Sequence, residues 1–262
     1  MTPKKTRKIA IANEKGGVGK TAMVVNLGAA LSAEGKNVLV VDMDPQHNAT
    51  IGLGVTVNDE MLNIYDLITD PASSPIPEAV CRTKWKGLDL IPSHIDLSGA
   101  EVELVDEEGR ENRLKEVLAA IEGRYDFIVM DTPPSLSLLT INVFASANEV
   151  LVPCQTHPYA FKALADLFDT ISDVQAEINP DLKISGIVAT FFDRRTRISR
   201  GIIEKLHSDE RYRDLVFTAF IRTNSAIAES SDLGKPVVFC RTRSYGALDY
   251  TAVAKEFLQL LK

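Results

Sequence analysis

The sequence lacks any apolar run that approaches the ~20 residues of a membrane-spanning helix. No segment near its N-terminus is long and apolar enough for a signal peptide. Only three cysteines occur in 262 residues, at Cys81, Cys154 and Cys240, and none forms a Cys-x-x-Cys pair. Isolated thiols of this kind favour burial in a reducing compartment over a disulfide framework. We therefore expect a cytoplasmic protein.

The sequence also lacks an excess of positive charge, because its formal net charge is -7. Any contact with nucleic acid must then come from a local basic patch. The composition, 45% hydrophobic and 25% charged, is typical of a soluble globular protein. A chain of this length can bury a full core, and we expect one domain over residues 1–262, with a disordered tail at 1–7.

Strand-like apolar runs alternate with helical patterns along the chain. Several runs are continuous Ile, Val and Leu, as in a sheet that is covered on both faces. The pattern predicts a doubly wound, mostly parallel α/β sheet flanked by helices, with ligands at the carboxyl ends of the strands. The expected strands are 8–13, 37–42, 88–91, 126–131, 149–153 and 183–190. The expected helices are 21–34, 98–107, 110–122, 158–178, 197–208, 224–233 and 245–261.

A glycine-rich segment, Glu14-Lys-Gly-Gly-Val-Gly-Lys-Thr21, joins the first expected strand to the first expected helix. It matches the phosphate-binding pattern Gly-x-x-x-x-Gly-Lys-[Ser/Thr], except that Glu14 replaces the first glycine and Lys15 adds a second lysine. The glycines allow backbone N–H groups to approach phosphates, and the helix N-terminus adds partial positive charge. We expect Lys20 to reach the β- and γ-phosphates and the Thr21 hydroxyl to bind Mg²⁺.

Three aspartates follow apolar strands. Asp42 and Asp44 end the second expected strand, and Asp131 ends the run Phe127-Ile-Val-Met-Asp131. An aspartate at a strand end is often only a turn former. Beside a phosphate-binding loop, however, such carboxylates favour a site for Mg²⁺ and its water shell.

These segments resemble the ParA/MinD group of deviant Walker A ATPases, and within it the ParA (Soj) partition ATPases. The resemblance also rests on Val41-Asp-Met-Asp-Pro-Gln46, Asn48-Ala-Thr50, the segment 91–101, Asp131-Thr-Pro-Pro-Ser-Leu136 and Leu139-Thr-Ile-Asn142. The chain departs from the group at Ala22, where relatives carry a second threonine, and at Thr156-His-Pro158.

The resemblance implies an ATPase that is weak alone, uses ATP and Mg²⁺, and forms an ATP sandwich dimer. Lys15 would cross to the partner subunit's phosphates, where two facing nucleotides concentrate negative charge. It also implies that Lys15, Lys20 and Asp44 are catalytic and that Thr21, Asp42 and Asp131 serve the metal. The implied nucleotide-binding residues are Lys15, Gly16, Gly17, Val18, Gly19, Lys20, Thr21, Ala22 and Asn224.

A basic cluster lies near residue 195. Its expected DNA-binding members are Arg194, Arg195, Arg197 and Arg200, joined by Arg222. Such residues can bind DNA phosphates without sequence preference, as the family does. On charge alone, a solvated helix start that pairs with nearby acids is an equal alternative.

We thus expect a nucleoid-associated partition ATPase that a ParB-like protein stimulates and that moves chromosome or plasmid DNA. One alternative is a positioning ATPase for a protein cargo on the nucleoid. A MinD-like membrane ATPase is another, but the chain shows no basic amphipathic helix after the last expected helix, and we expect no membrane partner. An electron-transfer ATPase and a metabolic ligase or kinase are the remaining alternatives.

Overall fold

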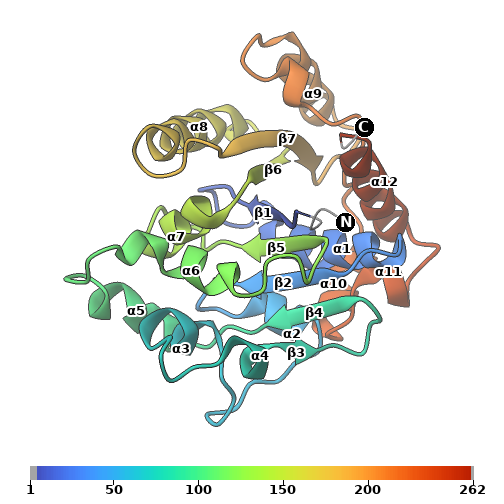
Figure 1. Ribbon diagram of the computed structural model, residues 1–262. Coiled ribbons are helices and arrows are strands. Elements are labelled where there is room, and N and C mark those ends of the chain that lie inside the picture. Colours follow the sequence, from blue (N-terminus) through green and yellow to red (C-terminus); the bar gives the residue numbers. More distant parts are fainter. Residues whose placement is uncertain (1–4, 261–262) are drawn as a thin grey trace.

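A seven-stranded sheet in the order β3-β4-β2-β5-β1-β6-β7 forms the centre of the molecule (Figure 1). The computed structural model describes residues 5–260. All neighbouring strands are parallel except β3 and β4. The strands are β1 Arg7–Ile11, β2 Val38–Asp42, β3 Cys81–Arg82, β4 Leu88–Ile91, β5 Phe127–Asp131, β6 Glu149–Gln155 and β7 Lys183–Thr190. This confirms the predicted doubly wound, mostly parallel sheet.

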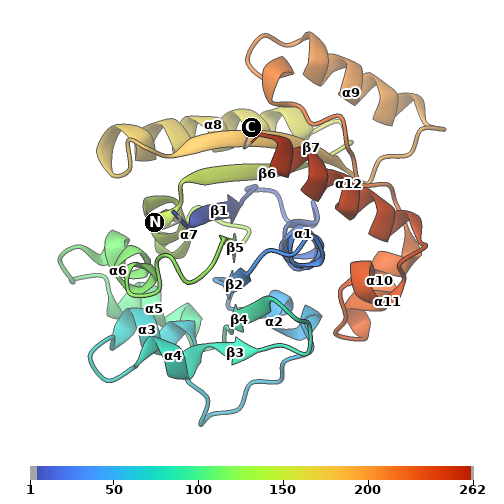
Figure 2. The same ribbon diagram turned by 45° about the vertical axis from the view of Figure 1, so that its right-hand side comes forward.

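Helices cover both faces of the sheet (Figure 2). The α-helices are α1 Lys20–Ala33, α2 Asn48–Gly52, α3 Ile64–Thr69, α4 Ile76–Ala79, α5 Leu97–Glu103, α6 Arg113–Ala119, α7 Leu138–Ser146, α8 Ala160–Glu177, α9 Arg197–Ser208, α10 Ser225–Asp232, α11 Val237–Cys240 and α12 Tyr245–Gln259. Two 3₁₀ turns, η1 Arg110–Asn112 and η2 Arg213–Leu215, complete the described elements.

Alternate residues of each strand build two separate cores. In β5, Ile128 and Met130 join the core that α3 and α5–α8 cover, whereas Phe127 and Val129 join the core under α1, α11 and α12. Successive side chains of a strand point to opposite faces, so an apolar strand with no polar alternation fills both cores at once. This explains the uninterrupted Ile, Val and Leu runs of the sequence.

The sequence patterns missed α7 and the short elements. α7 reads Leu-Leu-Thr-Ile-Asn-Val-Phe-Ala-Ser and is buried from Leu139 to Ser146 apart from Ile141, so it shows no polar face. The helices α2, α3, α4 and α11 have only four to six residues, too few for a helical period to appear. The two-residue strand β3 is equally short.

Part of the tail that was expected to be disordered, residues 1–7, belongs to the folded structure. Residues 1–4 of that tail lie outside the described residues. Thr6 is buried, and its hydroxyl donates to the Tyr125 carbonyl at 2.8 Å and accepts from the Gly123 N–H at 2.8 Å. Arg7 already belongs to β1. Among the residues described, the expected tail therefore does not extend to Thr6 and Arg7.

The two edges of the sheet end differently. β3, at one edge, pairs with β4 through only two residues. At the other edge, β7 is met by the segment 216–222, with isolated parallel bridges that join Ile187 to Val216 and Phe192 to Arg222. Gly186 faces this covering segment, because a Cβ there would stand 2.1 Å from Cε1 of Phe217.

We expect Gly186→Ala to destabilise the protein by about 1–3 kcal/mol, because the added methyl group overlaps the Phe217 ring and the covering segment must shift. Urea unfolding measures the change. The matched control is Gly201→Ala in α9, where an added Cβ meets no atom within 4 Å and helix propensity favours alanine. Equal unfolding midpoints for the wild type and Gly186→Ala would contradict the packing argument.

Candidate nucleotide-binding site

The glycine-rich loop lies between the carboxyl end of β1 and the N-terminus of α1, as the sequence predicts. Gly17 and Gly19 have φ values of 73° and 90°, in the left-handed region that glycine adopts without a steric penalty. Val18 between them is buried, and its carbonyl accepts a hydrogen bond from the Thr190 hydroxyl at 2.9 Å. No side chain caps the described N-terminus of α1, so its first N–H groups are available to an anion.

Lys20 lies folded under this loop. Its side chain is buried, and its Nζ donates to the Asn13 carbonyl at 3.0 Å. Burial lowers the pKa of Lys20 from its ordinary value, while the nearby carboxylates of Asp131 and Asp44 act in the opposite direction. Lys20 thus lines the pocket over the loop, with its ammonium held by a backbone carbonyl.

The side chain of Lys15 points to β6 of the same subunit, although the Lys15 carbonyl lies 3.5 Å from Nζ of Lys20. Its Nζ donates to Oε1 of Gln155 at 3.1 Å, and its backbone N–H donates to Oδ1 of Asn13 at 2.9 Å. Asn13 is fixed in turn, because its Nδ2 donates to the Pro153 carbonyl at 2.8 Å. The ammonium group of Lys15 therefore has a single amide partner and no carboxylate partner among the described residues.

Two carboxylates lie side by side at the ends of neighbouring strands. β1 and β2 flank β5, and the register pairs Asp131 with both Ile11 and Asp42. Asp42 is satisfied, since its Oδ2 accepts from the Thr50 N–H at 2.8 Å and from the Thr50 hydroxyl at 2.7 Å. Burial raises the pKa of Asp42 to about 6, against the opposite effect of these hydrogen bonds.

Asp131 is the unsatisfied member of the pair. Both of its carboxylate oxygens are buried without a hydrogen-bond partner of good geometry among the described residues. Burial, and then the charge of Asp42, raise the pKa of Asp131 well above its ordinary range, and Thr21 and Lys20 act in the opposite direction. A buried carboxylate without partners is expensive unless another group, such as a cation, completes it.

Asp44 occupies the turn that follows β2. Its side chain is nearly buried, and Oδ1 accepts from the Gln46 N–H at 2.9 Å. Its carbonyl accepts from the Ser93 hydroxyl at 2.8 Å and from the His47 N–H at 2.8 Å. Ser93 joins the site from the loop after β4, within the segment 91–101 on which the family resemblance rests, but it was not among the predicted site residues.

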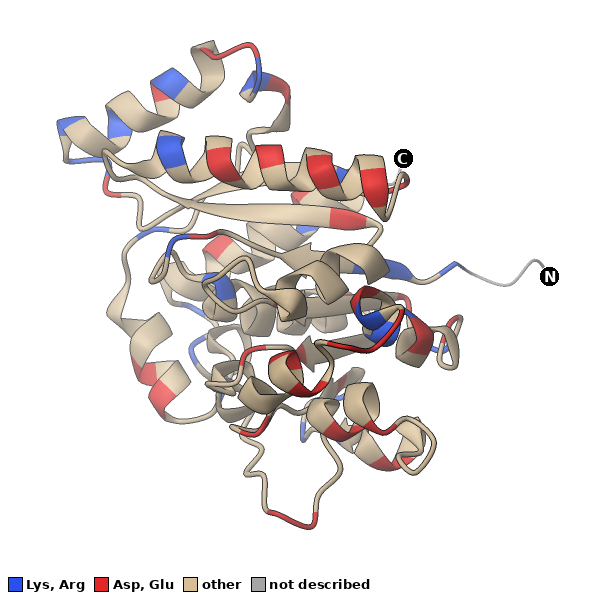
Figure 3. Ribbon diagram, turned by 90° about the vertical axis from the view of Figure 1, so that its left-hand side faces the viewer, with Lys and Arg blue, Asp and Glu red and all other residues tan. Residues whose placement is uncertain are grey.

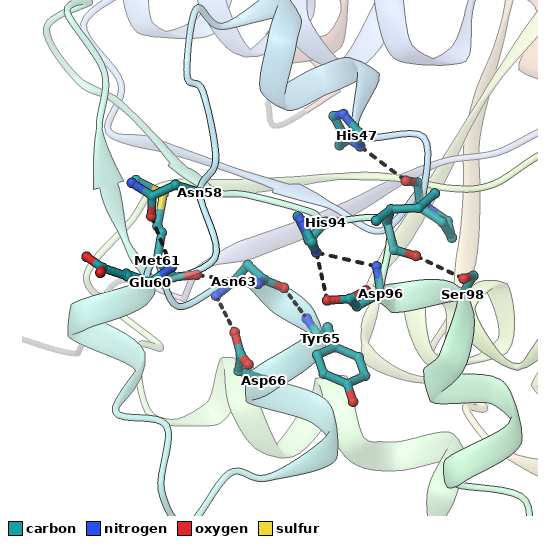
Figure 4. Close-up of polar contacts among 12 residues, drawn as sticks. His47, Asn58, Glu60, Met61, Asn63, Tyr65, Asp66, His94, Asp96 and Ser98 are labelled. Atoms are coloured by element: carbon teal, nitrogen blue, oxygen red, sulfur yellow. Dashed lines mark hydrogen bonds and ion pairs between the residues drawn. The ribbon is translucent and has the colours of Figure 1, made fainter.

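The same loop after β4 carries His94. Figure 4 shows His94 beside Asp96, and its Nδ1 lies 3.0 Å from Oδ2 of that residue. Across from this pair, Asn63 caps α3 by accepting from the Tyr65 N–H at 2.9 Å. These contacts are local structural bonds within the loop and within α3, whereas the Ser93 hydroxyl joins the loop to the Asp44 carbonyl.

A pocket of about 420 Å³ opens over the glycine-rich loop. It is lined by Gly16, Gly17, Gly19, Lys20, Thr21, Ala22, Asp44, Gln46, Asn48, Pro134 and Phe191. Six of the predicted nucleotide-binding residues thus share one cavity with Asp44. Lys15, Val18, Asp42, Asp131 and Asn224 do not line it. Sequence reasoning missed Phe191, which comes from the end of β7 and carries no motif.

The donors present fit a magnesium ion better than a metal held by protein ligands alone. Among the described residues, no group of three or more His, Cys, Asp or Glu side chains is arranged to hold a metal. Mg²⁺ is commonly bound by one or two carboxylate or hydroxyl ligands together with waters and substrate phosphates. The Thr21 hydroxyl at the pocket and the unpartnered oxygens of Asp131 suit such a site.

Comparison with known proteins places this geometry in a family. An AAA domain model matches residues 6–184. The sporulation initiation inhibitor protein Soj of Bacillus subtilis is 44% identical over 248 residues, which cover 95% of this chain and 96% of that protein. The chromosome partitioning protein ParA of Myxococcus xanthus is 39% identical, with 97% and 88% covered.

The chain belongs to the ParA/Soj family of P-loop ATPases. A solved structure of cobyrinic acid a,c-diamide synthase from Mycobacterium smegmatis with bound ADP and magnesium matches this ParA/Soj-type chain with a TM-score of 0.83 at 35% identity. It covers 98% of this chain and 95% of that one. McdA from Cyanothece, at 23% identity and a TM-score of 0.85 with 97% and 99% covered, shares the fold.

Asn224 of this ParA/Soj-type chain has a local structural role. It is the N-cap of α10, and its Oδ1 accepts from the Ala226 N–H at 2.9 Å. The residue is half-buried and lies outside the lining of the pocket. Its expected contact with the adenine base therefore stays a prediction.

The expected DNA-binding arginines fall into two environments. Arg194 and Arg195 just before α9, and Arg197 and Arg200 in its first turns, are exposed. Figure 3 shows Lys and Arg positions along α9 and a row of acidic positions along α8. Arg195 pairs with Asp193 at 2.8 Å, yet 85% of its side chain is exposed. Arg222 is held elsewhere, by Asp249 at 2.5 Å and over the Tyr245 ring at 4.0 Å.

None of the helices described between residues 5 and 260 is both long and apolar enough to cross a membrane.

We expect Asp131→Asn to raise the free energy of unfolding of the nucleotide-free protein at about pH 7.5, by on the order of 1–2 kcal/mol. Because burial raises the pKa of Asp131, the unfolded chain loses this proton first as the pH rises above about 4. Wild-type stability therefore falls with rising pH, and asparagine removes that loss.

Urea unfolding at about pH 4.5 and about pH 7.5 should give the larger gain at the higher pH. The exposed aspartate Asp173 on α8 provides the matched control, and Asp173→Asn should change stability little. If Asp131→Asn raises the free energy of unfolding by the same amount at both pH values, the fall in wild-type stability with rising pH does not come from Asp131.

Proposed function

We propose that this protein is a partition ATPase that works as a nucleotide-dependent switch in the cytoplasm and on the nucleoid. It binds ATP and Mg²⁺, dimerises around the nucleotide, binds DNA without sequence preference and is released when a ParB-like protein stimulates hydrolysis. The observation that carries the proposal is buried Asp131, which has no hydrogen bond of good geometry among the described residues, beside a phosphate-binding loop that holds two lysines. The names of the Soj and ParA relatives support the partition role.

The pocket supplies the groups that triphosphate binding needs. Backbone N–H groups of the loop and of the α1 N-terminus surround the phosphates, and Lys20 neutralises their charge. Thr21 and Asp131, with Asp42 next to Asp131, are the residues that would hold Mg²⁺, which would supply positive charge to the phosphates when bound. Asp44 lines the pocket and can accept a proton or a hydrogen bond from the attacking water.

The position of Lys15 supports a role across a dimer interface. Its ammonium lies outside the pocket lining, and its one hydrogen-bond partner within residues 5–260 is an amide oxygen, which is a weak partner for a charge. Two nucleotides that face each other would offer it a much stronger anionic partner. Lys15 would thus stabilise the ATP-bound dimer, although it does not line the nucleotide pocket of its own subunit.

The exposed arginines of α9 support DNA binding. Arg194, Arg197 and Arg200 make no ion pair among the described residues, so their charge remains available to phosphates. Arg222 already neutralises the nearly buried Asp249, and we assign it the smaller share of DNA binding. The protein carries net negative charge, so this local patch must provide the attraction.

A protein cargo on the nucleoid is the alternative to DNA partition, and it would use the same ATPase and DNA-binding surfaces. The name of the Mycobacterium smegmatis structure raises a small-molecule synthase as a second candidate. DNA-dependent or ParB-dependent stimulation of ATP hydrolysis would favour partition, whereas a synthase would need no DNA. Copurification of a cargo adaptor in place of a ParB-like protein would favour protein cargo.

We expect Lys15→Gln to retain ATP affinity within about threefold but to lose ATP-dependent dimerisation and partner-stimulated hydrolysis, because the cation that crosses to the partner nucleotide is gone. Fluorescent ATP titration and light scattering measure the two properties separately. Lys86→Gln, on the exposed turn before β4, is the matched control. An ATP-bound dimer of Lys15→Gln as stable as that of the wild type would rule out the role in trans.

We expect the double variant Arg197→Glu and Arg200→Glu to weaken ATP-dependent DNA binding by at least about tenfold at low salt, because two phosphate contacts become repulsive. Anisotropy with a DNA duplex of arbitrary sequence measures this, and dimerisation with ATP should persist. Lys84→Glu with Lys86→Glu makes the same change of charge on the β3–β4 turn. If both double variants weaken DNA binding equally, the effect is one of net charge and α9 is not the DNA surface.

A further inference from the structure

Phe191 combines three features that an ordinary surface residue does not share. Its φ is 52°, a left-handed conformation that is an outlier for a bulky side chain. The residue is 42% exposed although it is aromatic, and it lines the pocket over the glycine-rich loop. Its ring lies against Gly19, where an added Cβ would meet Cε2 of Phe191 at 3.5 Å. Strained residues of this kind persist where the surrounding structure holds them, often at functional sites.

The residue before it fastens the end of β7 to the same loop. The Thr190 side chain is buried, and its hydroxyl donates to the Val18 carbonyl at 2.9 Å. Val18 lies between the two left-handed glycines of the loop, so a rearrangement there changes the position of this carbonyl. The glycine-rich loop and the 190–191 segment therefore move together or lose a buried hydrogen bond.

The residue that holds Phe191 is Thr156, which follows β6. Its backbone N–H donates to the Thr190 carbonyl at 3.1 Å, and its hydroxyl donates to the Phe191 carbonyl at 3.2 Å. The same hydroxyl lies 3.0 Å from the Ser199 hydroxyl, which is in the first turn of α9. Both hydroxyl groups are buried, so water is a poor substitute for either bond.

These bonds form one continuous chain. The Asp193 N–H donates to the Ser199 hydroxyl at 3.3 Å. The Ser199 and Thr156 hydroxyls lie 3.0 Å apart, and when Thr156 donates its one proton to the Phe191 carbonyl, its oxygen accepts from Ser199. The Thr156 hydroxyl also lies 3.4 Å from the Thr190 carbonyl, so both residues at the end of β7 are within its reach. Asp193 also holds Arg195 by its carboxylate. The chain thus extends from the wall of the nucleotide pocket to the arginines before and in α9.

We propose that Thr156 is a positioning residue that couples occupancy of the nucleotide pocket to the placement of the basic N-terminus of α9, with Phe191 as the contact on the pocket side. This inference rests on the proposed function. Besides dimerisation, which the function requires, it gives the nucleotide pocket a link to α9 within a single subunit. A nucleotide that fills the pocket presses on or displaces the Phe191 ring, and the hydrogen-bond chain transmits the change to Ser199. The arginines at 194–200 then adopt the arrangement that favours DNA.

The coupling can be measured without DNA, by limited trypsin digestion of the full-length protein with and without ATP and Mg²⁺. Trypsin cleaves after the exposed arginines 194–200, and mass spectrometry gives the rate at each bond. We expect ATP to change these rates in the wild type by about fivefold or more, and the change to be lost in Thr156→Val, which keeps the side-chain shape without the hydroxyl. Thr156→Ser should restore it.

Matched variants separate coupling from simple loss of structure. Thr69→Val removes a threonine hydroxyl that bonds the Tyr65 carbonyl in α3, and it should leave the response to ATP intact. Fluorescent ATP titration should show that Thr156→Val binds ATP within about threefold of the wild type. If Thr156→Val fails to fold, Ser199→Ala interrupts the same chain at its other end and should abolish the response in the same way.

The outcomes distinguish this inference from the proposed function. Cleavage rates in the wild type that do not respond to ATP, or a full response in both Thr156→Val and Ser199→Ala, would overturn the coupling whether or not DNA is bound. A wild type whose cleavage responds to ATP through Thr156, but which binds no DNA in anisotropy assays, would retain the coupling and refute the proposed function. Loss of ATP binding in Thr156→Val and Ser199→Ala alike would reduce Thr156 to a structural role and would also overturn the inference.

Discussion

Two carboxylates buried next to each other at the ends of adjacent parallel strands set the constraint that organises this site. Asp42 and Asp131 are fixed by the register of β2 and β5, so neither can move away from the other. Like charges in a low-dielectric interior repel strongly unless protons or cations balance them. Thr50 satisfies Asp42, and Lys20 and Thr21 act on Asp131, but among the described residues neither Asp131 oxygen has a hydrogen bond of good geometry. The folded protein is therefore incomplete in a way that a bound cation with its phosphates would correct.

The sequence was informative where chemistry and fold are both local. The glycine-rich loop, its flanking strand and helix, and the aspartates at strand ends lie within short segments, and the structure places them at the same edge of the sheet. All six predicted strands appear at nearly the predicted limits, because continuous apolar runs in a parallel sheet have few alternative structures. The helix α7 was missed for the same physical reason, since burial on all sides removes the polar face that makes a helix visible.

What the sequence could not give are contacts between distant segments. Phe191 reaches the pocket from the end of β7, and no local pattern marks it. Ser93 lies in the segment 91–101 of the family resemblance, but its bond to the Asp44 carbonyl, 49 residues away along the chain, is visible only in the structure. Arg222 is indistinguishable in sequence from the arginines of α9, yet the fold pairs it with Asp249. In each case the partner lies more than twenty residues away along the chain. The sequence lists candidate groups, and the tertiary structure decides which of them meet.

The treatment of the sheet edges has a consequence for self-association. One edge ends in the two-residue strand β3, and the other is covered along β7 by the segment 216–222. A strand from another chain usually adds to an unpaired edge strand, and neither edge described here presents a long unpaired strand. Continuous intermolecular sheets, whether in a dimer or in an aggregate, are thereby disfavoured. Assembly of this fold is directed to loops and helix ends, which can rearrange when a ligand arrives without breaking the sheet that carries them.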